Sequence, residues 1–160
     1  MVNVDELDHE FFMKEAIKEA KVAGERGDLP VGAVIVHEGK IISRGNNQIN
    51  TKENRTLHAE MSAINQEAPF LKKHARECVL YTSLEPCIMC LSTIVMTNIR
   101  HVVYAVDDHY MNMKPFIKSN DYINKRVHSY TGGILENESF EVIQHYDTRM
   151  AQLVSTGQPV

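Results

Sequence analysis

Four residues in two short segments have the types and the spacing of a metal site. His58 and Glu60 lie in TLHAEMSAI, and Cys87 and Cys90 lie in LEPCIMC. One imidazole and two cysteines provide three ligands, the number that a catalytic zinc ion uses while it leaves its fourth position to water. The residue types therefore predict a catalytic zinc site, with His58, Cys87 and Cys90 as its ligands.

Glu60 suits the proton transfers that such a site requires. Zinc lowers the pKa of a bound water from about 16 to about 7, and a nearby carboxylate can take a proton from that water and pass it to a leaving amine. The predicted chemistry is hydrolytic attack on an electrophilic carbon, with Glu60 as general base and then general acid.

Two other interpretations of the cysteines stay open. A C-x-x-C segment beside α/β patterning can be a redox pair, and zinc can be purely structural, as in a non-catalytic subunit of a heteromer. A structural zinc needs a fourth protein ligand. Cys78 is the remaining cysteine, but its β-rich surroundings are more typical of a small buried residue. Glu60 favours the catalytic site because a structural zinc needs no proton shuttle.

Hydrophobic spacing predicts the elements that would position these residues. Apolar residues recur at helical spacing from Asp8 to Gly24, and β-rich runs at 31–36 and 40–43 predict a hairpin around a Gly-containing turn. The other expected elements are a short helix from about residue 58, strands at 78–83 and 101–106, a helix at 86–96 that Pro86 opens, an edge strand near 127–130 and a closing helix of about four turns over 140–153.

This order of elements predicts an α/β fold, a mixed sheet with helices on both faces. Strands separated by helices should run parallel, so that helix N-termini gather at one sheet edge, where α/β proteins form their sites. No repeat, low-complexity tract or linker-like segment divides the 160 residues, and we expect a single domain over residues 1–160.

The composition excludes several classes of protein. Hydrophobic residues make up 43% and charged residues 24%, as in globular rather than disordered chains, and no apolar run approaches the ~20 residues of a membrane helix. The acidic start, MVNVDELDHE, lacks the features of a secretory signal. We expect a cytoplasmic protein with no membrane partner. The net charge of −4 provides no overall basic field for nucleic acid.

The pattern H-x-E followed by P-C-x-x-C resembles the zinc-dependent cytidine and deoxycytidylate deaminase superfamily. The resemblance runs from Val31 to Asp108, and more loosely through Val142, and is carried by TLHAEMSAI, LYTSLEPCIMC and IRHVVYAVDD. It implies a cytidine deaminase-like fold, a three-layer sandwich with a mixed five-stranded sheet, one Zn²⁺ per chain and a homodimer whose subunits share their pockets.

The same resemblance implies roles for individual residues. It assigns His58, Cys87 and Cys90 as zinc ligands and Glu60 as the proton shuttle. The substrate-binding residues that it implies are Asn47, which would hydrogen-bond the base, Ala59, whose backbone would help to hold it, Glu85, which would orient the ligand loop, and Asp108.

The expected substrate is inferred from positions where this sequence differs from some members of the family. The chain resembles bacterial tRNA adenosine deaminases in Asp107-Asp108 and in KRVHSYTGGILENE, but residues 134–160 hold four acids and one base where those enzymes have a basic tail. Thr56-Leu57-His58 looks more like free-base cytosine or guanine deaminases. We therefore expect a zinc-dependent aminohydrolase of purine or pyrimidine metabolism that releases ammonia from a free nucleobase, nucleoside or related amino-heterocycle, its small-molecule partner. A tRNA-specific adenosine deaminase is the alternative.

Two groups of side chains bear on this choice. The first would form a lid and lining over a small pocket: Tyr110, Phe116 and Phe140, with Met111 and Met113. The second could contact RNA, although basic clusters of this size are usually solvated faces: Lys72, Lys73 and Arg76, and Lys114, Lys118, Lys125 and Arg126.

Overall fold

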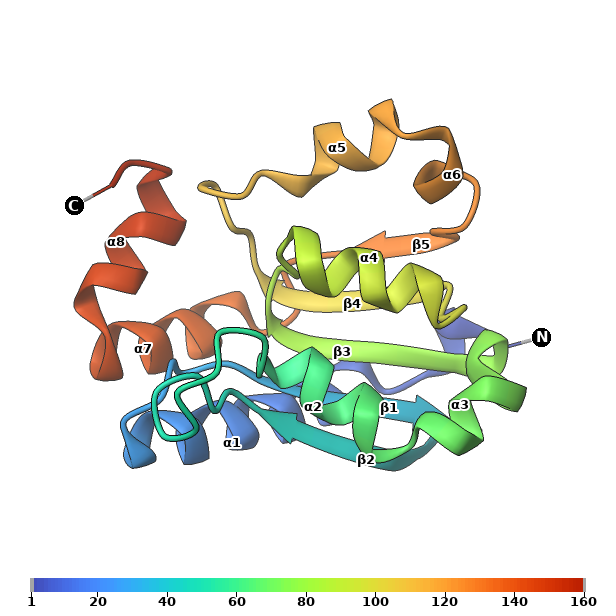
Figure 1. Ribbon diagram of the computed structural model, residues 1–160, viewed down its shortest axis with the longest axis horizontal. Coiled ribbons are helices and arrows are strands. Elements are labelled where there is room, and N and C mark those ends of the chain that lie inside the picture. The colour runs from blue at the N-terminus through green and yellow to red at the C-terminus, as the bar shows by residue number, and fades with distance from the viewer. Residues whose placement is uncertain (1, 160) are drawn as a thin grey trace.

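The computed structural model describes residues 2–159 and shows one five-stranded sheet between layers of helices (Figure 1). The spatial order of the strands is β2-β1-β3-β4-β5. Strand β1 is antiparallel to both of its neighbours, whereas β3, β4 and β5 are parallel, so β2 to β5 all point the same way. The predicted mixed sheet is confirmed. Its strands are β1 (Gly32–His37), β2 (Lys40–Asn46), β3 (Cys78–Leu84), β4 (His101–Val106) and β5 (Ser129–Thr131).

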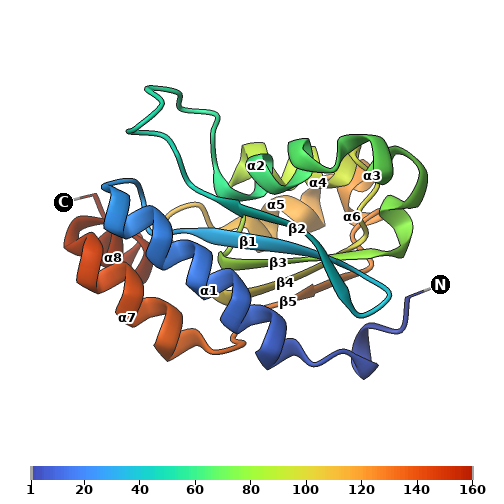
Figure 2. The same ribbon diagram turned by 90° about the horizontal axis from the view of Figure 1, so that it is seen from below.

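Helices cover both faces of the sheet (Figure 2). On one face lie α1 (His9–Arg26) and α7 (Glu136–Tyr146), and on the other lie α2 (Ala59–Gln66), α3 (Ala68–His74) and α4 (Ile88–Met96). Within residues 2–159, no helix has both the length and the hydrophobicity that crossing a membrane requires. The smaller elements are α5 (Met113–Ser119), α6 (Asp121–Asn124), α8 (Thr148–Thr156) and the 3-10 turns η1 (Val4–Glu6) and η2 (Ala75–Glu77).

The first helix and the hairpin form largely as their sequences predict. The Asp8 carboxylate accepts a hydrogen bond from the Phe11 N–H and caps α1. The helix ends at Gly27, in the left-handed conformation, rather than at Gly24, whose missing side chain instead makes room for the Tyr146 ring. In the hairpin, Glu38 and Gly39 both have positive φ, which suits the twist of a two-residue turn.

Two predictions about helix boundaries are wrong. Helix α4 begins at Ile88 with Cys87 as its N-cap, so Pro86 precedes the helix instead of opening it. The expected closing helix is two helices, because Asp147 takes an extended conformation and its carboxylate accepts a hydrogen bond from the Met150 N–H, which caps α8.

Three helices were not expected from the sequence. Two of them, α5 and α6, form a small apolar cluster with α4 that only the tertiary structure assembles, and α3 is a short continuation after α2. The buried members of the cluster are Leu91, Val95, Met113, Ile117 and Ile123.

Two glycines let helices approach the strands on opposite faces of the sheet. A Cβ atom added at Gly32 would lie 2.1 Å from the backbone oxygen of Ala16 in α1. One added at Gly45 would lie 2.1 Å from the backbone oxygen of Ala59 in α2. The contact at Gly45 fixes where α2 begins, and therefore where His58 lies.

We predict that Gly45→Ala destabilises the protein several-fold more than Gly39→Ala. The new methyl group at position 45 meets helix backbone that cannot move aside, whereas at position 39 nothing lies within 4 Å and the cost is the positive φ alone, about 1–2 kcal/mol. Urea unfolding of both variants checks this. Equal losses of unfolding free energy would show that the close approach of α2 is not a constraint.

Candidate metal and catalytic site

The expected site residues gather at one edge of the sheet, as the order of elements predicts. Asn47 follows the end of β2, Glu85 the end of β3, and Asp108 lies two residues after β4. His58 and Cys87 are the N-caps of α2 and α4, which start at this same edge. The carboxyl ends of strands and the N-termini of helices thus meet here.

The donor set fits one zinc ion. The Nδ1 atom of His58 lies 3.5 Å from the Sγ atoms of both Cys87 and Cys90, and the three ligand atoms lie within 4.8 Å of one another. Tetrahedral zinc, with bonds of about 2.1 Å to nitrogen and 2.3 Å to sulfur, requires N···S separations of about 3.6 Å. An imidazole and two thiolates are also donors that zinc prefers, so the predicted zinc cofactor is confirmed.

The surroundings favour a thiolate at Cys87. Its pKa is lowered to about 4, chiefly by the hydrogen bond from Cys90, with a further contribution from His58, against the opposing effect of burial. Donating that hydrogen bond, together with burial, raises the pKa of Cys90. The unpaired N–H groups at the start of α4 add positive potential. Cys87 and Cys90 together therefore carry one negative charge, which attracts a cation.

Glu60 directs its carboxylate at the ligand cluster. Its Oε2 lies 3.4 Å from the Sγ atom of Cys90, and its Oε1 accepts a hydrogen bond from the Thr82 hydroxyl at 3.4 Å. The residue is 3% exposed, and burial raises the pKa of its carboxyl group. His58 has extended backbone outside the helical repeat. The side chains of His58 and Glu60 can therefore both point toward the ligand cluster although they are two residues apart. The Glu60 carboxylate can exchange a proton there.

A cavity of about 530 Å³ opens beside Glu60 and the ligands. This volume lies in the range of roughly 300–1,000 Å³ that is usual for small-molecule and cofactor sites. Its walls come from the connection between α1 and β1, from the loops after β2, β3 and β4 and from α8, and they include Leu29, Asn47, Glu85, Asp108, Tyr110, Met111, Arg149 and Met150.

The predicted lid is only partly correct. Tyr110 and Met111 line the cavity and are a little under half exposed. Phe116 and Met113 instead pack in the apolar cluster against α4, and Phe140 packs on the main core. These three side chains pack α5 and α7 against the rest of the protein, so they do not reach the cavity.

Of the two residues expected to hold the base, Asn47 lines the cavity, and Ala59 lies between His58 and Glu60, which also line it. Asn47 is 2% exposed, its backbone N–H donates to the Val31 oxygen and its Oδ1 accepts from the Ile49 N–H. The Nδ2 hydrogens are thereby left for a ligand in the cavity. Ala59 is fully buried in the first turn of α2, where backbone N–H groups have no helical partner.

Glu85 and Asp108 hold the chain around the cavity. Glu85 accepts hydrogen bonds from the Asp108 N–H at 2.9 Å and from the Tyr130 hydroxyl at 3.0 Å, so both of its oxygens are in use. Asp108 accepts from the N–H groups of Tyr110 and Met111. The geometry therefore favours a positioning role for both acids. Tyr130 was missed because only the pairing of β5 with β4 brings it here.

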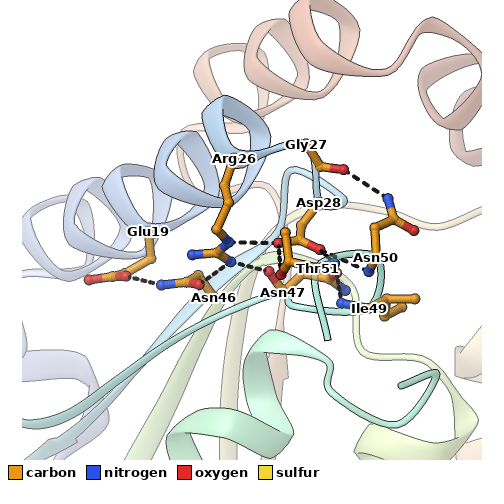
Figure 3. Close-up of polar contacts among 9 residues, drawn as sticks. All are labelled: Glu19, Arg26, Gly27, Asp28, Asn46, Asn47, Ile49, Asn50 and Thr51. Carbon is orange, nitrogen blue, oxygen red and sulfur yellow. Dashed lines mark hydrogen bonds and ion pairs between the residues drawn. The ribbon is translucent and has the colours of Figure 1, made fainter. Parts of the chain in front are cut away.

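Arg26 and Asp28 form a second support that the sequence did not reveal (Figure 3). The Asp28 side chain is completely buried and accepts hydrogen bonds from Arg26, from the Asn50 N–H and from both the N–H and the hydroxyl of Thr51. Arg26 also donates to the backbone oxygen of Asn47 at 2.6 Å. This cluster ties the loop at 47–57 to the end of α1 and fixes Asn47.

Cys78 does not complete a four-ligand site. It begins β3, at the opposite end of that strand from Leu84, which lines the cavity. Its thiol donates to the backbone oxygen of His74 at 3.4 Å. In the part of the chain that the structure describes, the ligand group at the cavity contains His58, Cys87 and Cys90 only.

Comparison with known proteins identifies the family. Residues 6–106 match the cytidine and deoxycytidylate deaminase zinc-binding region. A tRNA-specific adenosine deaminase of Buchnera aphidicola is 35% identical over 150 residues, 91% of each chain. The chain therefore belongs to this zinc-binding deaminase family, as its motifs predict.

Other relatives match over part of their length. A tRNA-specific adenosine deaminase of Aquifex aeolicus is 45% identical over 100 residues, 62% of this chain and 66% of that protein, just under two thirds. A structure from a study of A-to-I editing by tRNA deaminases matches with a TM-score of 0.69 and 31% identity, over 82% of this chain and 98% of that one. A guanine deaminase structure from Bacillus subtilis has 40% identity but covers 64% of this chain, with a TM-score of 0.57.

These matches overturn the leading expectation about substrate and partner. A free nucleobase or nucleoside as small-molecule substrate is wrong, because the curated relatives that are 35%, 43% and 45% identical to this chain are tRNA-specific adenosine deaminases. The expectation rested on the acidic balance of residues 134–160 and on the likeness of Thr56-Leu57-His58 to free-base deaminases. Contacts to RNA depend instead on where a few cations lie around the cavity.

We predict that the stability advantage of the wild type over Asp28→Asn depends on pH. Burial alone would raise the pKa of Asp28, but hydrogen bonds from Thr51, Arg26 and Asn50 lower it from 3.8 to about 2. The carboxylate thus contributes stability, about 2 kcal/mol, that is fully present above pH 4 and is lost as the pH falls toward 2.

Urea unfolding at several pH values checks this prediction, with the exposed-site variant Asp5→Asn as the control. The difference between wild type and Asp28→Asn should shrink below pH 4, while Asp5→Asn should behave as the wild type. A difference that stays constant from pH 7 to pH 3 would contradict the charge-based account.

Proposed function

We propose that this protein is a tRNA adenosine deaminase, which hydrolyses the exocyclic amine of an adenosine in the anticodon loop to give inosine and ammonia. The observation that carries the proposal is the alignment of 91% of the chain with a tRNA-specific adenosine deaminase. The donor set, the adjoining buried carboxylate and the cavity support the same chemistry.

The residues around the cavity have different roles in this reaction. Zinc held by His58, Cys87 and Cys90 would supply a Lewis acid that makes water a nucleophile near neutral pH. The Glu60 carboxylate takes a proton from the attacking water and delivers it to the departing amine. Water adds to the amine-bearing carbon, the carbon–nitrogen bond breaks, and ammonia leaves as the carbonyl of inosine forms.

Binding and positioning are the tasks of the other cavity residues. The Nδ2 group of Asn47 can donate to an acceptor on the base, and the N–H of Ala59 lies at the free start of α2. Glu85 and Asp108 hold the turn that carries Tyr110 and Met111 along the open side. The flipped base would stack against this side, because single-stranded RNA is recognised largely through unstacked bases.

Two exposed arginines are suited to the RNA backbone. Arg149 lines the cavity beside Glu60, and Arg55 lines a neighbouring cavity of about 610 Å³ that shares His58 and borders the loop at 47–57. Of the basic residues that could contact RNA, Lys72, Lys73 and Arg76 lie at the opposite end of the sheet, and Lys114 forms an ion pair with Asp107. That the protein forms a homodimer stays a prediction. So does its location in the cytoplasm, where it would meet tRNA.

We predict that Glu60→Gln retains zinc and loses about 10²–10⁴-fold in turnover on tRNA, because the proton carrier is gone while the ligands remain. Cys87→Ala should lose both zinc and turnover. Inosine formation in an anticodon stem-loop and zinc content per chain are the measurements, and Glu67→Gln, at the far end of α2, is the control. Undiminished inosine formation by Glu60→Gln would rule out the mechanism.

We also predict that Arg55→Ala and Arg149→Ala raise KM for tRNA several-fold with little change in kcat. Each lost phosphate contact should reduce the steepness of the plot of log binding constant against log salt concentration by about 0.7–0.9. Lys73→Ala, on α3 at the opposite sheet end, is the matched control. Equal effects of all three variants would show that the cavity arginines make no specific RNA contact.

A further inference from the structure

A second group of potential metal ligands lies at the ends of β1, α3 and η2. The end of β1 and α3 lie at the opposite end of the sheet from the starts of α2 and α4 (Figure 1). His37 ends β1, His74 ends α3 and Glu77 ends η2. In the sheet register His37 pairs with Cys78, the first residue of β3. The seven residues of β3 separate this point from Leu84 at the cavity, which is roughly 20 Å along a strand. The group is therefore independent of the zinc site described above.

The three ligand atoms have nearly the spacing of a coordination sphere. Oε2 of Glu77 lies 3.1 Å from Nε2 of His37 and 3.6 Å from Nδ1 of His74, and all three atoms lie within 4.8 Å of one another. Bonds of about 2.0–2.1 Å to tetrahedral zinc place two ligand atoms about 3.4 Å apart. The distances from Oε2 of Glu77 to the two histidine nitrogens, 3.1 Å and 3.6 Å, lie on either side of that value.

An unsatisfied nitrogen points to a missing partner. Among the described residues, Nδ1 of His74 is a buried side-chain atom without a hydrogen-bond partner. Glu77 is hydrogen-bonded to His37 at 3.1 Å, whereas it lies 3.6 Å from Nδ1 of His74, an ion-pair distance too long for a hydrogen bond. Buried polar atoms are nearly always paired, and a cation beside Glu77 would pair this one.

The aromatic ring of Phe70 orients both imidazoles. It stacks on His74 with a centroid separation of 4.6 Å and meets the edge of His37 at 5.1 Å. Ligands whose rings are already held in place lose less conformational entropy when they bind a metal. The site is thus partly preorganised from three elements, β1, α3 and η2.

We propose that His37, His74 and Glu77 form a second metal site that binds zinc or a similar borderline divalent transition cation. Two imidazoles and one carboxylate suit such ions, whereas Mg²⁺ and Ca²⁺ prefer oxygen ligands throughout. His74 and Glu77 have side chains 42% and 49% exposed, so the remaining coordination position opens to solvent. Bound metal would tie the hairpin end of β1 to the connection between α3 and β3 and stabilise the folded state.

The test counts zinc in tag-free protein dialysed against micromolar zinc. The wild type should hold two zinc ions per chain, and His74→Gln and Glu77→Gln should hold one, their affinity for the second ion being weakened by more than about tenfold. His145→Gln, a change of an exposed histidine on α7, is the matched control and should keep two. Circular dichroism of each variant confirms folding.

A second probe separates the two sites in the intact protein. Cobalt(II) added to protein that already holds one zinc per chain should broaden the NMR signals of His37 and His74 and leave those of His58 unchanged. One zinc per chain in the wild type, or a second ion that both His74→Gln and Glu77→Gln retain, would overturn the proposal. Neither readout involves turnover, so the result is independent of the proposed function.

Discussion

The candidate site depends on two helix N-termini that meet at one point of the sheet edge. His58 and Cys87 are the N-caps of α2 and α4, and their extended backbone takes both side chains out of the helical repeat. With Cys90 one turn into α4, this places an imidazole nitrogen 3.5 Å from two sulfurs. The same N-termini supply unpaired N–H groups that favour a thiolate, so one local arrangement provides both the geometry and the charge.

Backbone contact and buried polar groups hold the helices and loops at that point. Gly45 lets β2 touch the backbone of Ala59, which sets the start of α2. On the other side of the cavity, Glu85 bonds to Asp108 and to the hydroxyl of Tyr130. Asp28 anchors the loop that carries Asn47 (Figure 3). Such supports fix the functional groups before substrate arrives, which is how preorganised sites avoid reorganisation during reaction.

The parts of this arrangement that the sequence predicts are those encoded locally. The ligand residues lie in two short motifs, and β3 and β4 are nearly continuous apolar runs. Tyr130 meets Glu85 across 45 residues, and Asp28 meets Thr51 across 23, and no local pattern marks either contact. The split at Asp147 also escaped prediction, because apolar residues on both sides of it keep a helical spacing. The substrate was misjudged because net charge says little about where single cations lie around a cavity.

We propose that this deaminase site acts on an adenosine within tRNA. The most direct measurement is mass spectrometry of nucleosides from tRNA incubated with the zinc-loaded protein, beside a panel of free bases and nucleosides. The account predicts inosine in the tRNA, at one adenosine of the anticodon loop, and no ammonia from the panel. Ammonia from free guanine or cytosine, with no inosine in tRNA, would contradict it.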